Sequence, residues 1–194
     1  MRRTLATIGL AAASVVPTGI LGATASAATP KLSSHLLSIS QMPTGWAVYN
    51  GSATGLGCLA NTLEPKGVKQ TSRANVEFED SGRLPAVVER LVTFSNAKTG
   101  YTKVVAKLTA CKHLSGETGG QKFSGTVGSA SFPRFGDDSA AFEANFTVQG
   151  ELLGEDLVIV RKGNIVMGID EGNFPPVDVN QFQALVNKAV AKLP

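Results

Sequence analysis

The feature that most constrains the fold is a series of strand-like segments joined by short turns. Six segments have the β-branched, aromatic and alternating apolar residues of strands, at 73–80, 86–95, 121–127, 139–149, 151–161 and 164–170. Gly82 separates the first two, and Lys162-Gly163 separates the last two, in the manner of hairpin turns. Because strands joined by short turns pair with their neighbours in opposite directions, we expect an antiparallel sheet of about six strands.

Three further segments have apolar residues at helical spacing. The first covers 32–40 and is followed by Pro43. The second follows Asn96, a good N-cap residue, and its apolar stripe ends at Cys111. The third follows Asp178. With helices packed on the sheet, the fold class is α+β, and the predicted order of elements is α-β-β-α-β-β-β-β-α.

The N-terminus has the organisation of a secretory signal peptide. Arg2 and Arg3 precede a mostly apolar run at 5–21, and Ala25-Ser26-Ala27 supplies the small residues that a signal peptidase requires. We expect a Sec-type signal peptide at 1–27, cleaved after Ala27. A membrane anchor is the alternative, but the apolar run is short for a span of about 20 residues. The sequence thus predicts a single secreted domain at 28–194, located outside the cell or in the cell envelope, with no membrane span after cleavage.

The charge of the predicted mature chain excludes one class of partner. Two of the 18 Lys and Arg residues lie in the leader, so 16 basic side chains remain against 15 acidic ones. The remaining cations do not form the basic cluster that a nucleic acid requires. We therefore expect no nucleic-acid partner.

The two cysteines of the chain are Cys58 and Cys111. In an oxidising compartment two thiols usually pair, so we expect a structural disulfide. A catalytic thiol or a metal pair is the alternative, but a metal site requires further ligands at close spacing. The loop of 53 residues between them predicts a stabilisation of about 4 kcal/mol.

The sequence contains no catalytic motif. A nucleophile elbow, a phosphate-binding loop, a zinc-protease helix and an EF-hand loop are all absent. We expect no enzyme, no cofactor and no metal site. Two pairs of adjacent acids, Asp137-Asp138 and Asp170-Glu171, could bind a cation or do acid–base chemistry, although neighbouring acids at turns are more often solvated or capping.

One stretch stands out because no charged residue occurs between positions 32 and 63. It contains Met42, Trp46 and Tyr49. One interpretation is a segment simply packed on the sheet; the other is the uncharged wall of a ligand groove. Phe132 and Phe135 form a second uncharged aromatic cluster, which would belong to the core if buried and to an interaction site if exposed.

Several short motifs resemble a group of secreted actinobacterial proteins. These are similar to the extracellular sensor domain of the PknH-type mycobacterial kinases, and more loosely to LpqN-like envelope proteins with a Mog1/PsbP-like fold. The resemblance implies an α+β sandwich with a groove and a sensing or binding role. The chain has one cysteine pair where the kinase sensor domains have two disulfides. The segments that carry the resemblance are Met42-Pro43-Thr44-Gly45-Trp46, Gly57-Cys58, Ala110-Cys111, 136–142 and 158–164.

These observations predict a secreted, non-catalytic, sensor-like domain of the bacterial cell envelope. An apolar or amphiphilic small molecule, or an envelope protein, is the expected partner, with Met42, Trp46, Tyr49, Phe132 and Phe135 as candidate contacts. The alternatives are a small secreted hydrolase that uses the three aspartates and a protein-interaction or inhibitor domain.

Overall fold

A computed structural model describes residues 31–49, 57–80, 83–118, 121–148, 150–173 and 178–194. The predicted signal peptide at 1–27 lies outside these residues. No helix in the described ranges is long and apolar enough to cross a membrane.

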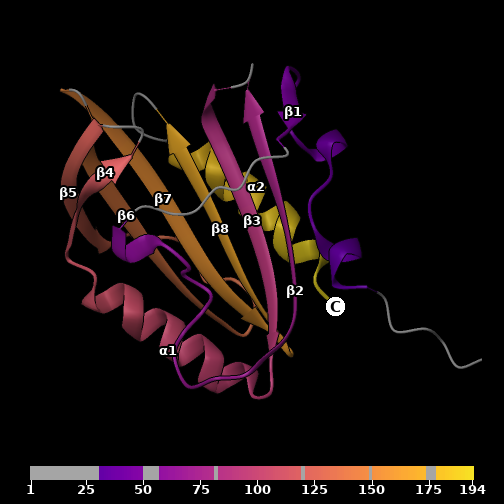
Figure 1. Ribbon diagram of the computed structural model, residues 1–194. Coiled ribbons are helices and arrows are strands. Elements are labelled where there is room, and N and C mark those ends of the chain that lie inside the picture. The colour runs from indigo at the N-terminus through magenta and orange to yellow at the C-terminus, as the bar shows by residue number, and fades with distance from the viewer. Residues whose placement is uncertain (1–30, 50–56, 81–82, 119–120, 149, 174–177) are drawn as a thin grey trace, which may run out of the picture.

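Eight antiparallel strands form one sheet in the order β1-β2-β3-β8-β7-β6-β5-β4 (Figure 1). The prediction of an antiparallel sheet is confirmed, because every pair of neighbouring strands runs in opposite directions. The strands are β1 (Trp46–Val48), β2 (Gln70–Asp80), β3 (Arg83–Phe94), β4 (His113–Thr118), β5 (Gln121–Ser129), β6 (Asp138–Val148), β7 (Glu151–Lys162) and β8 (Ile165–Asn173).

The sheet has two strands more than the expected six, and both lie at its edges. β1 is only three residues long, so it has no alternation to detect. β4 contains Ser, Gly, His and Glu, residues of low strand propensity, yet it pairs with β5 along its whole length. Both strands form because a neighbouring strand supplies backbone hydrogen-bond partners. The local sequence does not reveal this pairing.

One α-helix covers each face of the sheet (Figure 1). Helix α1 (Ala97–Ala110) buries Val104 and Leu108 against one face, and α2 (Val179–Lys192) buries Phe182 and Val186 against the other. Asn96 and Asp178 cap these helices, as predicted: each side chain accepts backbone hydrogen bonds from the first turn. Each helix thus encloses a separate apolar core.

The expected first helix at 32–40 is wrong. Instead, two 3₁₀ turns, η1 (Leu32–His35) and η2 (Ile39–Gln41), flank an extended stretch. The Leu37 amide donates to Glu89 Oε2 of β3 at 2.6 Å, whereas in a helix it would donate to a carbonyl one turn back. A short helix is costly to nucleate, so this tertiary hydrogen bond and the burial of Leu37 determine the local conformation.

The predicted disulfide is present. Cys58, in the 3₁₀ turn η3 (Gly57–Leu59), bonds to Cys111, the C-cap residue of α1, with the two Cα atoms 5.8 Å apart. Leu59 and Leu63, which follow Cys58, pack into the core on the α1 face. The bond therefore ties the segment that precedes β2 to the end of α1.

Replacing both cysteines, as Cys58→Ser with Cys111→Ser, should lower the free energy of unfolding by about 4 kcal/mol, because the unfolded chain regains the entropy of an open 53-residue loop. Urea unfolding followed by circular dichroism measures this change. An unfolding midpoint equal to that of the wild type would show that the bond contributes no stability.

Candidate functional site

The described residues enclose a pocket between the N-terminal segment and α2, and we call it the Trp46 pocket. Its volume is about 100 Å³. The predicted contacts Met42 and Trp46 both line it, so the structure brings these two together. The lining residues are Gln41, Met42, Pro43 and Trp46 of the N-terminal segment, Val87 of β3, Glu171 of β8, and Gln181, Ala184, Leu185 and Lys188 of α2.

A tight turn at Gly45 positions Trp46 at the pocket. Gly45 has φ +99°, a region that favours glycine, and the chain then enters β1 with Trp46 opposite Asp80. Trp46 is half-buried and packs on the core of the α2 face. The turn therefore sets the indole against the edge of the core rather than in solvent.

Two lysines of α2 fasten the N-terminal wall of the pocket. Lys188 Nζ donates to the backbone oxygen of Gln41 at 2.9 Å, and Lys192 Nζ donates to the side-chain oxygen of Gln41 at 3.2 Å. On the other side of the segment, Glu89 accepts from the Leu37 amide. These contacts hold η2 over the helix and close the pocket on one side.

The carboxyl group at the pocket belongs to Glu171, which is only 3% exposed. It makes no hydrogen bond or ion pair with a residue in the described part of the chain. Burial, together with the negative charges of Asp156 and Asp178, raises the pKa of Glu171 to about 7. A carboxyl group with no partner in an apolar site is costly for folding, and such groups gather at functional sites.

Two more acids continue from Glu171 across the sheet. Glu171 lies opposite Asp156 of β7, and Asp156 lies opposite Glu143 of β6. Neighbouring strands are about 5 Å apart, so the three carboxyl groups form a row with like charges side by side. Burial and the charge of Glu143 raise the pKa of Asp156 to about 6.

The other predicted contacts lie elsewhere. The Tyr49 side chain is 46% exposed and does not line the Trp46 pocket. Phe132 packs edge to face on Phe182 of α2, with ring centroids 5.8 Å apart. Phe135 is buried in the core of the α2 face. Both residues also line a separate hollow of about 180 Å³ beside this core, and neither lines the Trp46 pocket.

The three aspartates of the hydrolase alternative are held by arginines. Arg161 forms ion pairs with Asp137 at 2.9 Å and Asp138 at 2.6 Å, and Arg90 forms one with Asp170 at 2.6 Å. Asp138 and Asp170 lie opposite positions 161 and 157 of β7, which are about 13 Å apart along an extended strand. The fold brings Asp137 and Asp138 together on Arg161 but places Asp170 away from them.

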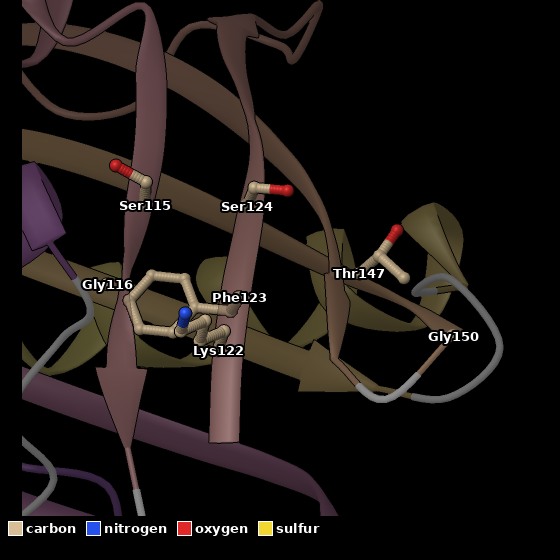
Figure 2. Close-up of a pocket in the computed structure, with 7 residues that line it drawn as sticks. All are labelled: Ser115, Gly116, Lys122, Phe123, Ser124, Thr147 and Gly150. Carbon is tan, nitrogen blue, oxygen red and sulfur yellow. The ribbon is translucent and has the colours of Figure 1, made fainter. Parts of the chain in front are cut away.

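A second hollow lies at the other end of the sheet, over β4, β5 and β6 (Figure 2). It measures about 480 Å³ and is open to solvent. Ser115, Ser124 and Thr147 form a cross-strand row of exposed hydroxyl groups there. The Phe123 ring lies beside Gly116 on β4. None of its polar side chains is buried, so this hollow has the character of an ordinary solvated surface.

The sequence did not indicate that Glu171 lies at the pocket. Its pattern favours a turn at Asp170-Glu171, whereas β8 continues to Asn173 and places both acids in the sheet. Because adjacent strand residues point to opposite faces, Asp170 meets Arg90 and Glu171 lies at the Trp46 pocket. The uncharged stretch at 32–63 indicated that this segment supplies no ion-pair partner for an acid. It did not indicate which acid the segment would face.

Comparison with solved structures shows a likeness of fold. No protein-family model matches the chain, and no curated protein matches it. The fold is similar to the crystal structure of the extracellular domain of PknH from Mycobacterium tuberculosis, with a TM-score of 0.52 and 13% identity over 70% of this chain and 67% of that one. At this identity the likeness establishes a shared fold, which agrees with the resemblance that the short motifs indicated.

Buried carboxyl groups predict an unusual pH dependence of stability. Burial raises the pKa values of Glu89, Asp156 and Glu171 to about 7, 6 and 7, and it raises the pKa of Glu155 above its ordinary value. In the unfolded chain these groups lose their protons near pH 4, so the folded state binds more protons between about pH 4 and pH 8. The free energy of unfolding should therefore fall as the pH rises through this range.

Urea unfolding at a series of pH values measures this slope, and Glu89→Gln should make it shallower because one of the four groups no longer titrates. The glutamine keeps an oxygen that can accept from the Leu37 amide. Glu117→Gln, at an exposed position of β4, is the matched control and should leave the slope unchanged. A stability that rises with pH between about 5 and 8 would contradict the assignment.

Proposed function

We propose that this chain is a secreted, non-catalytic, sensor-like domain of the bacterial cell envelope that binds a small ligand in the Trp46 pocket. The observation that carries the proposal is the pocket itself. An uncharged segment with an aromatic and a thioether side chain closes over a helix, and one unpartnered acid lies inside. Ligand sites are commonly concave and apolar, with few polar groups at defined positions.

The setting of the domain supports an extracellular role. The disulfide between Cys58 and Cys111 fits an oxidising compartment, and the structurally similar protein is an extracellular domain. The N-terminal sequence has the organisation of a cleaved Sec-type signal peptide. The motifs shared with PknH-type sensor domains and LpqN-like envelope proteins favour the same location.

Binding is preferred to catalysis because of how the acids are arranged. Arg161 pairs with both Asp137 and Asp138, and Arg90 pairs with Asp170. The pocket holds one carboxyl group, and no serine, threonine, cysteine or histidine lines it. General acid–base catalysis requires a positioned proton donor or acceptor near a reacting group, usually with a partner. The pocket instead offers shape, apolar surface and one buried carboxyl group, with Lys188 at its rim.

Native mass spectrometry of the protein recovered from its own host tests the proposal. The wild type should carry a non-covalent mass that disappears on denaturation. Trp46→Ala should lose this mass, because it removes one wall of the pocket. Tyr49→Ala is the matched control, since it removes an exposed aromatic residue three positions away that does not line the pocket, and it should retain the mass.

Two results would count against the proposed site. Equal native and denatured masses for the wild type would mean that no resident ligand is carried. A mass retained by Trp46→Ala to the same extent as by Tyr49→Ala would place the ligand elsewhere on the molecule.

A further inference from the structure

Glu171 has no counter-charge in the part of the chain that the structure describes. The wall formed by the N-terminal segment cannot supply one, because no charged residue occurs between positions 32 and 63. The lysine of α2 that lines the pocket is Lys188, which is exposed and donates a hydrogen bond from its ammonium group to the Gln41 backbone. The fold therefore leaves a buried acid, only 3% exposed, at a partly open pocket and without a positive partner in the described residues.

The surroundings of Glu171 strengthen the negative potential of the pocket. Asp156 lies next to it on β7 and is buried, and Glu143 follows on β6. Asp178, at the start of α2, adds a fourth acid near the same end of the sheet. Negative groups surrounded by apolar walls focus a field that attracts cations.

The other walls suit the organic part of a cation. Trp46 offers an indole, the aromatic ring that attracts cations best, and Met42 adds a polarisable thioether. Val87 and Leu185 provide aliphatic surface. A volume of about 100 Å³ accommodates a small alkyl group but not an extended lipid chain.

We propose that the Trp46 pocket binds a small alkylammonium group, with Glu171 as its counter-ion and Trp46 as the aromatic wall beside the cation. This inference rests on the proposed function and specifies its ligand class. It narrows the expected apolar or amphiphilic ligand to one whose polar end is a positively charged amine. A metal cation fits less well, because the pocket offers one carboxyl group and no further cluster of ligating side chains occurs in the described residues.

Trp46 makes the test direct, because it is the only tryptophan of the chain and its fluorescence reports the pocket. Three probes of similar size should be titrated at about pH 8, where Glu171 is ionised: butylammonium, butanol and butyrate. Butylammonium should bind at least about tenfold more tightly than butanol, and butyrate should bind most weakly.

Glu171→Gln should reduce the affinity for butylammonium to that for butanol, because the amide keeps the shape of the side chain without its charge. Glu117→Gln, the same change at an exposed position far from the pocket, should bind as the wild type does. If Glu171→Gln fails to fold, the wild type provides a second measurement. Lowering the pH from about 8 to about 5.5 protonates Glu171, and it should weaken the binding of butylammonium but not that of butanol. The charged groups that face Glu171 are Asp156, Asp178 and, at the rim of the pocket, Lys188.

The outcomes separate the two proposals. Butanol or butyrate binding as tightly as butylammonium would overturn the amine inference and leave the pocket as a binding site. Undiminished butylammonium binding by Glu171→Gln would also overturn it. A fluorescence response to none of the probes would overturn the amine inference. The proposed function would then be decided by native mass spectrometry, which compares the ligand mass carried by Trp46→Ala with that carried by Tyr49→Ala.

Discussion

The structure depends on the burial of both faces of the central strands. In β7, consecutive residues from Asp156 to Val160 are buried, so side chains on both sides of the strand pack against protein. Leu157 and Ile159 belong to the core under α1, whereas Val158 and Val160 belong to the core under α2. An antiparallel sheet often exposes one face, but here one helix on each side completes two cores. The edge strands, the N-terminal segment and the pocket all take their positions from these two layers.

Much of the fold could be predicted because its signals are local. The caps at Asn96 and Asp178, the hairpin turn near Gly163 and the alternation in β2 and β6 each depend on residues close in sequence. The edge strands β1 and β4 could not be predicted, since their pairing partners create them. The conformation of η1 and η2 could not be predicted either. The Leu37 amide, which would bond within a helix, donates instead to Glu89, 52 residues away.

The candidate site also has one part that local sequence indicates and one part that only the tertiary structure reveals. Met42 and Trp46 could be identified because an uncharged stretch with an aromatic residue is visible in the sequence. Glu171 could not, because its role follows from strand parity and from the register that sets it opposite Asp156 and Val87. A buried acid next to another acid lowers stability, and an apolar residue in its place would pack without this cost. That cost favours a functional reason for Glu171 at this position.

The N-terminal wall of the pocket is also part of the core under α2. Leu37 and Met42 are buried in that core, and hydrogen bonds from Lys188 and Lys192 to Gln41 and from the Leu37 amide to Glu89 fix the segment around them. Among the described residues, the core under α1 contains none that precedes Cys58. Local unfolding of the segment would therefore open the α2 core and leave the α1 core intact, so the closure of the pocket and the stability of one half of the domain are a single property.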